Sequence, residues 1–127
     1  MILPSLYIHS TRLMDRGVFT EKDIEPNRLI EVAPVIVMSA EEKKLLDQTA
    51  LHDYIFEWGE DDTQCCMAMG YVPVYNHSYH SNCEYIMDYQ NRQISIKTVR
   101  KINAGEELFI NYNGNWNDES PLWFDAQ

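Results

Sequence analysis

The sequence predicts a mostly β protein built from several small sheets, with one or two short helices. Three observations support this fold class. Several runs are rich in β-branched and aromatic residues and are bounded by Pro, Gly, Asn or charged residues, which is typical of short strands. One later segment alternates apolar and polar residues, the pattern of a half-buried strand. Only one stretch carries a convincing helix start signal.

Three runs in the first half of the chain are predicted to be strands, namely Leu6 to Ser10, Leu29 to Met38 and Tyr54 to Trp58. The second run is apolar almost throughout except at Glu31, and Pro34 interrupts it. Because proline cannot donate a backbone hydrogen bond, we expect this strand to bend or break there and to lie at the edge of a sheet.

A short helix is predicted after the second of these strands. Ser39 and Glu42 match a capping box, in which the serine hydroxyl accepts from the third backbone N–H of the helix and the glutamate returns to the cap. The helix should run from about Ala40 to about Gln48. Its few apolar positions are not enough for a helical bundle, so the architecture remains mostly β.

Two hairpins are predicted in the remainder. An acidic turn at 59–62 separates two strand-like segments that could pair. Residues 84–90 and 93–99 flank a two-residue connection suited to a tight hairpin. In the second of these strands Ile94 and Ile96 alternate with polar residues, which predicts one buried face.

The length and charge of the chain limit its organisation and its partners. A chain of 127 residues suffices for one domain with a hydrophobic core, so we predict a single domain over residues 1–127. Twenty acidic residues against ten basic ones give a formal charge of −10, which would repel phosphate backbones and anionic membranes. We therefore expect no direct nucleic-acid binding, no membrane association, and a basic protein or peptide as partner.

Cysteine content and hydropathy indicate where the protein works. Three cysteines, two of them adjacent, do not form an even disulfide framework. No apolar run is long enough to span a membrane, and the N-terminal segment lacks the pattern of a signal peptide. We expect an intracellular, soluble protein, cytoplasmic or, in a eukaryote, nuclear.

The segment YNHSYHSNCEY, residues 75–85, concentrates polar chemistry and first suggests a metal site. His77, His80 and Cys83 follow the pattern H-x2-H-x2-C. Zinc needs three or four converging ligands, usually from two separated pairs, and a second pair is missing. Cys65 and Cys66 do not readily supply it, because adjacent strand residues point to opposite faces. We predict no metal.

Nucleophilic hydrolysis is an alternative for the same segment, since Ser78 and Ser81 lie close to its histidines. A catalytic serine needs a strained elbow, and no G-x-S-x-G sequence occurs. The signal for a hydrolase is at background level.

Four short motifs follow one another along the chain. They are R-G-V-F at 16–19, N-H-S at 76–78 with S-N-C at 81–83, G-E-E-L at 105–108, and N-Y at 111–112. In this order and rough spacing they resemble the SET-domain protein lysine methyltransferases, and the resemblance spans about Leu6 to Phe124. It implies a SET-domain fold of several small sheets, with a C-terminal segment threaded under a preceding loop.

The resemblance also implies a binding site for S-adenosylmethionine. Asn76 matches the asparagine whose side-chain amide lies near the methionine moiety, and His77 the histidine that contacts adenine mainly through its backbone. Arg16, Gly17 and Val18 match the turn that receives the methionine end, where backbone N–H groups suit a carboxylate.

The catalytic residues are assigned by the same resemblance. Tyr112 matches the catalytic tyrosine, and Tyr85 stands where some members place a tyrosine lining the lysine channel. Ile110 stands at the channel position associated with the number of methyl groups added, and leaves that number open. Trp123 belongs to a C-terminal aromatic segment like the one that some members fold over the cofactor and channel.

The chemistry explains these residue types. Methyl transfer from a sulfonium to lysine requires the neutral amine, whose pKa is ordinarily about 10.4. An aromatic channel and the adjacent sulfonium charge both lower that pKa. A tyrosine then needs only to orient the nitrogen and stabilise the methyl group in transit, so neither a metal nor a strong base is required. We predict methyl transfer from S-adenosylmethionine to lysine of a basic protein or histone-like tail.

Asp15 and the acidic residues keep two alternative functions open. Asp15 stands where the family has a glycine, and its carboxylate would repel that of the cofactor. This motivates the alternative of a catalytically silent SET-like module that binds lysine-rich peptides. A further alternative is a small acidic interaction protein that only masks basic partners. Glu57, Glu60, Asp61 and Asp62 either attract a basic peptide that carries the target lysine or form a solvated turn. The small size of the chain would suit a homodimer that completes the substrate groove.

Overall fold

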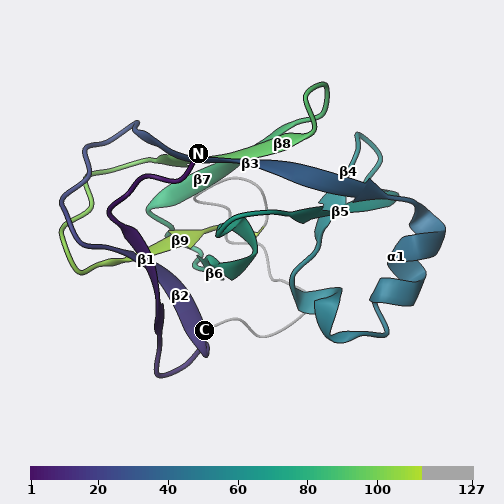
Figure 1. Cartoon of the computed structure of the whole chain (residues 1–127), viewed down its shortest axis with the longest axis horizontal. Helices are drawn as coiled ribbons and strands as arrows, with labels where there is room; N and C mark the ends of the chain where they lie inside the picture. Colours follow the sequence, from purple (N-terminus) through teal and green to yellow (C-terminus); the bar gives the residue numbers. More distant parts are fainter. Residues whose placement is uncertain (113–127) are drawn as a thin grey trace.

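The computed structural model describes residues 1–112 and has a mostly β architecture (Figure 1). This confirms the predicted fold class. The nine strands within these residues form one four-stranded and one five-stranded sheet. The strands are β1 (Leu6–Ser10), β2 (Arg16–Thr20), β3 (Leu29–Met38), β4 (Phe56–Trp58), β5 (Gln64–Ala68), β6 (Asn76–His77), β7 (Cys83–Asp88), β8 (Gln93–Thr98) and β9 (Glu107–Ile110).

The predicted capping box is confirmed and begins the helix α1 (Ala40–Leu46). The Ser39 hydroxyl accepts from the Glu42 backbone N–H at 3.1 Å, and the Glu42 carboxylate accepts from the Ser39 N–H at 3.0 Å. The helix ends two residues before the predicted Gln48 and packs beside β5 at one end of the molecule (Figure 1). Two single 3-10 turns follow, η1 (Ala50–Asp53) and η2 (Val72–Val74).

The five-stranded sheet has the order β4-β5-β3-β8-β7, so β3 is its central strand. The prediction that Pro34 would place this strand at an edge is therefore wrong. Residues 29–34 pair with β8, and residues 35–38 pair with β5. The missing N–H of Pro34 thus falls at the end of the β5 ladder, where it removes little pairing.

Both predicted hairpins are present. β4 and β5 pair around the acidic turn, with β4 starting at Phe56 rather than at Tyr54. β7 and β8 pair with Asp88 opposite Gln93, so the connection has four residues and the predicted two-residue turn is wrong. An Asp88 carboxylate that accepts twice from Asn91, at 3.0 and 2.8 Å, shapes this longer loop.

The four-stranded sheet has the order β1-β2-β9-β6. β9 lies between β2, to which it is antiparallel, and β6, to which it is parallel. This sheet therefore joins the start, the middle and the end of the described chain. The threading predicted for the C-terminal segment concerns residues beyond Tyr112, which lie outside the described residues.

Side chains from strands of both sheets form the core. In β8 the exposure alternates as predicted, with Ile94 and Ile96 fully buried. Val18, Ile30, Leu108 and Ile110 are also fully buried. Within residues 1–112 no helix has both the length and the apolar character required to cross a membrane.

Candidate active site

Asn76 lies on β6, where its side chain reaches back to β2. Its amide nitrogen donates to the Arg16 backbone carbonyl and to a Glu107 carboxylate oxygen, at 2.8 Å each. The structure therefore brings together two of the predicted cofactor segments, which are 60 residues apart in sequence. Gly17 is buried beside them, and a β-carbon there would approach the Asn76 amide nitrogen to 2.9 Å.

Arg16, Gly17 and Val18 were predicted to form a turn, but they lie in strand β2. The turn precedes them, because the Thr11 N–H donates to the Asp15 carbonyl at 2.9 Å and the chain reverses there. The Val18 side chain is fully buried and is opposite Leu108 in the β2–β9 ladder. Val18 therefore belongs to the core.

Asp15 has a φ of 64°, which is the left-handed region that favours glycine. This explains why a glycine suits the position. The side chain of Asp15 is 87% exposed and lies 3.8 Å from the Arg16 guanidinium nitrogen. Water and this ion pair screen the carboxylate, so its repulsion of a neighbouring anion is weaker than the sequence suggested.

His77 is buried, and its side chain has a role that the sequence did not predict. Its Nδ1 accepts from the Tyr112 backbone N–H at 3.0 Å. Nε2 therefore carries the proton in the neutral ring, and it has no hydrogen-bond partner within residues 1–112. Burial lowers the pKa of His77, which keeps the ring neutral at physiological pH. The imidazole thus fixes the backbone of Tyr112.

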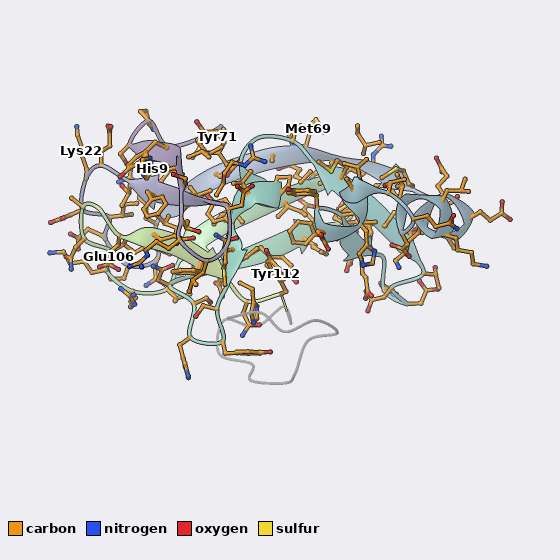
Figure 2. All side chains as sticks on the ribbon, turned by 90° about the horizontal axis from the view of Figure 1, so that it is seen from below. His9, Lys22, Met69, Tyr71, Glu106 and Tyr112 are labelled. Carbon is orange, nitrogen blue, oxygen red and sulfur yellow. The ribbon has the colours of Figure 1, made fainter. Side chains whose placement is uncertain are left out.

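Tyr112 is the last described residue and lies near the middle of the long dimension of the molecule (Figure 2). Its hydroxyl donates to the Tyr75 backbone carbonyl at 2.7 Å. Burial, followed by the nearby Asp53 carboxylate, raises the pKa of Tyr112 to about 12. Tyr112 therefore stays protonated at neutral pH and cannot act as a base; it can orient an incoming group.

Tyr85 lies on β7, and its hydroxyl donates to the Tyr112 backbone carbonyl at 3.2 Å. Its ring packs edge-on against Phe56 with centroids 5.4 Å apart. Burial raises the pKa of Tyr85 to about 12, with further contributions from the Asp62 and Glu57 carboxylates. The structure therefore joins Tyr85 of the five-stranded sheet to Tyr112, which follows β9 of the four-stranded sheet.

Besides the half-buried Glu107, three exposed carboxylates act on these two tyrosines. Asp53 contributes to the raised pKa of Tyr112, and Glu57 and Asp62 contribute to that of Tyr85. These three carboxylates are on exposed residues, in η1, β4 and the β4–β5 turn. A negative field at the tyrosine hydroxyls favours a cation there.

Two other predicted residues have different outcomes. Ile110 is fully buried in the core and is opposite His77 in the β6–β9 ladder, two residues before Tyr112. Trp123 lies outside the described residues, so its role stays a prediction.

Sequence reasoning gave no role to Asn82 and Glu107, although both belong to the quoted motifs. The Asn82 amide donates to the Glu107 carbonyl at 2.9 Å and accepts from the Phe109 N–H at 2.8 Å, so it bonds β9 as a backbone segment would. Glu107 is half-buried, and burial raises its pKa while the bond from Asn76 opposes the rise. The signal available in the sequence for Glu107 was a carboxylate placed beside the apolar residues of a strand.

No group of three or more His, Cys, Asp or Glu side chains suited to a metal ion occurs among residues 1–112. His80 is exposed, whereas His77 and Cys83 are buried. Cys65, Cys66 and Cys83 are all free thiols. The H-x2-H-x2-C pattern therefore does not converge on one point.

The arrangement agrees with a comparison against known families, in which the SET domain matches residues 15–113. The chain belongs to the SET-domain family of protein lysine methyltransferases. Members of this family use S-adenosylmethionine as methyl donor. The described segments that carry the family motifs, from β2 through β6 to Tyr112, are the ones that meet in space.

A relative from Schizosaccharomyces pombe is 34% identical over 128 residues, which covers 100% of this chain and 82% of the relative. That protein is a histone-lysine N-methyltransferase specific for lysine-37 of H3. Because the match extends over the full chain, the relationship is not confined to the short motifs.

Solved structures show the same fold. A candidate histone methyltransferase of Plasmodium falciparum is 26% identical, with a TM-score of 0.66 over 91% of this chain and 98% of that one. A Chaetomium thermophilum Polycomb Repressive Complex 2 structure matches at a TM-score of 0.74 and 20% identity, over 91% of this chain and 16% of that one. The second likeness concerns the fold alone.

Proposed function

We propose that the chain transfers methyl groups from S-adenosylmethionine to a lysine of a histone-like tail, with Tyr112 and Tyr85 at the reacting amine. The observation that carries this proposal is the position of the Tyr112 hydroxyl, which donates to the Tyr75 carbonyl at 2.7 Å while Tyr85 holds the Tyr112 backbone. A protonated hydroxyl held in this way can orient an amine but cannot deprotonate it.

The mechanism needs few protein groups. When bound, S-adenosylmethionine would supply an activated methyl group to the lysine nitrogen, with S-adenosylhomocysteine as the leaving group. In our proposal Asn76, the β2 backbone and the His77 backbone bind the cofactor. The His77 ring fixes the backbone of Tyr112. Because Tyr112 and Tyr85 stay protonated, water takes the proton of the lysine.

The negative field supports a basic substrate. Asp53, Glu57 and Asp62 would attract a lysine-rich segment and bring the ammonium to the tyrosines. The same field stabilises the ammonium and therefore opposes its deprotonation, so the cofactor's positive charge has to offset it. The specificity of the S. pombe relative makes histone H3 the first substrate to test. In a eukaryotic host this substrate implies a nuclear location.

The direct test is incubation with labelled S-adenosylmethionine and a panel of basic proteins that includes histone H3. The wild type is compared with Tyr112→Phe, which removes only the hydroxyl. We expect kcat to fall about 100-fold, the size of effect typical for loss of one transition-state hydrogen bond. Tyr71→Phe is the matched control, because Tyr71 lies well away from Tyr112 (Figure 2). Equal label transfer by wild type and Tyr112→Phe would exclude the proposed role of Tyr112.

The two alternatives predict other results. A silent module would bind lysine-rich peptides without label transfer, and Asp15 remains the reason to consider it. An acidic interaction protein would release every basic partner at high salt, since binding by charge alone is screened. A homodimer stays a prediction, and sedimentation equilibrium measures it directly.

A further inference from the structure

Glu107 occupies a special place in the four-stranded sheet. It begins β9 and is opposite Phe19 of β2, while Phe109 two residues later is opposite Asn76 of β6. Because alternate residues of a strand share a face, the side chains of Glu107 and Asn76 lie on the same face. That face is opposite to the one on which Leu108 and Ile110 enter the core.

The hydrogen bonds of Asn76 determine which way its amide faces. Its nitrogen is 2.8 Å from both the Arg16 carbonyl oxygen and the Glu107 carboxylate. Each of these partners can only accept, so the amide must turn its two N–H groups towards them. The amide oxygen of Asn76 then points away, and it has no hydrogen-bond partner within the described residues. Asn76 is thus held as an acceptor.

The absence of a side chain at Gly17 makes this arrangement possible. A β-carbon there would overlap the Glu107 carboxylate and would lie 2.9 Å from the Asn76 amide nitrogen. Gly17 is needed for space, whereas Asp15 two residues earlier is the position with unusual backbone geometry. Glu107, Asn76 and Gly17 therefore form one packed unit, which we call the Asn76 clamp.

We propose that Glu107 is a positioning residue that fixes the Asn76 amide with its oxygen outward, so that this oxygen accepts a hydrogen bond from the α-ammonium group of the cofactor. The inference rests on the proposed function, because it takes S-adenosylmethionine as the ligand. It further states that Glu107 makes the site bind nucleosides with an α-ammonium group more tightly than nucleosides without one. Without Glu107 only the Arg16 carbonyl would hold the Asn76 amide, which would then present an N–H group to that cation in part of its population.

The test uses two nucleosides and isothermal titration calorimetry. S-adenosylhomocysteine carries the ammonium, and 5′-methylthioadenosine lacks the whole amino-acid part. Glu107→Ala removes the acceptor from the clamp, and we expect about tenfold weaker binding of S-adenosylhomocysteine with binding of 5′-methylthioadenosine unchanged. Glu107→Gln keeps an acceptor oxygen for Asn76 and should stay within about threefold of wild type for both nucleosides.

A control variant and the opposite outcomes complete the design. Glu106→Gln alters the neighbouring carboxylate, which bonds to the Asn103 N–H and to Arg100 away from the clamp, and should leave both affinities unchanged. Equal weakening of both nucleosides by Glu107→Ala would overturn the positioning role, as would an unchanged affinity for S-adenosylhomocysteine. If Glu107→Gln lost as much affinity for S-adenosylhomocysteine as Glu107→Ala, the positioning role would also be overturned, because the charge of Glu107 alone would then explain the effect. If the wild type binds neither nucleoside, the cofactor assignment fails together with this proposal.

Discussion

Glu31 and Glu107 have similar surroundings, but their hydrogen bonds have different consequences. Each is a strand glutamate whose pKa is raised chiefly by burial. Each carboxylate lies where a neighbouring glycine has no side chain, Gly70 beside Glu31 and Gly17 beside Glu107. Each also accepts a hydrogen bond from the segment that precedes or forms β6.

The two residues differ in whether a polar group beside them stays available to bind a ligand. Glu31 is fully buried, and its two oxygens accept from the Tyr71 N–H at 2.7 Å and the Tyr75 hydroxyl at 3.1 Å. Glu107 is half-buried and holds Asn76, whose amide oxygen faces outward. A carboxylate in the core satisfies the groups around it, whereas one at a site leaves a group oriented and available. Only the hydrogen bonds distinguish the two residues, because in the sequence each is a glutamate within a strand.

The largest expected effect is on stability at Glu31. Glu31→Ala leaves the buried Tyr75 hydroxyl and the partly buried Tyr71 N–H without an acceptor, and each buried donor left unpaired costs about 1–3 kcal/mol. We expect the free energy of unfolding to fall by about 3 kcal/mol or more, measured by urea denaturation. Glu107→Ala should cost less than about 1 kcal/mol, because Asn76 keeps its bond to Arg16. Equal losses at the two sites would contradict the comparison.

The two glycines should separate binding from stability. Gly70 has a φ of 67° and a β-carbon there would overlap Glu31, so Gly70→Ala should destabilise the fold by about 2 kcal/mol. Gly17→Ala displaces the Asn76 clamp and should weaken S-adenosylhomocysteine binding about tenfold, with a smaller loss of stability. Calorimetry and thermal unfolding of both variants measure this. A larger affinity loss in Gly70→Ala than in Gly17→Ala would reverse our assignment.

A smaller effect should appear in the pH dependence of stability. The pKa of Glu31 is raised in the folded protein above its ordinary value of 4.5. The folded state therefore holds the proton more tightly, and stability from this group is complete below pH 4.5 and is lost as pH rises through the folded pKa. The stability difference between wild type and Glu31→Gln should fall with pH above 4.5. A difference that rises with pH would have the wrong sign. Glu107→Gln should show the same direction with a shallower slope, since Glu107 is less buried.

The smallest effect is expected at Asp15. Asp15→Gly removes a side chain from a left-handed backbone position and should stabilise the protein by about 0.5–1 kcal/mol. The midpoint of thermal unfolding would rise by a few degrees. Because the Asp15 carboxylate is exposed, cofactor affinity should increase by less than about threefold. A much larger gain in affinity would mean that Asp15 repels the cofactor directly.

Local signals in the sequence predicted the local parts of the fold. The capping box at Ser39 and the alternation at Ile94 and Ile96 each depend on neighbours within a few residues, and both are confirmed. The edge position of the strand with Pro34 was wrong, because the strand changes partners at that residue and no local signal records this.

The sequence predicted only those parts of the site that the family motifs imply. The proximity of Asn76 to Arg16 and of Tyr85 to Tyr112 agrees with the family pattern. The bonds that Glu31, Asn82 and Glu107 make could not be predicted, because each depends on a partner 25 or more residues away. Glu31 did stand out as the one charged residue in an apolar run. The structure was needed to show that Glu31 accepts a hydrogen bond from the Tyr75 hydroxyl.

The amide of Asn82 has a consequence for the order of folding. It serves as a substitute peptide unit beside β9, continuing a ladder that β6 supplies over only two residues. The bonds that complete this region span 60, 31 and 25 residues of sequence. Such distant closures carry a large entropic cost before they are rewarded, so we expect them to form late. Pulse-labelled hydrogen exchange should therefore protect the β7–β8 hairpin before the Phe109 N–H, and catalytic competence would be the last property the chain acquires.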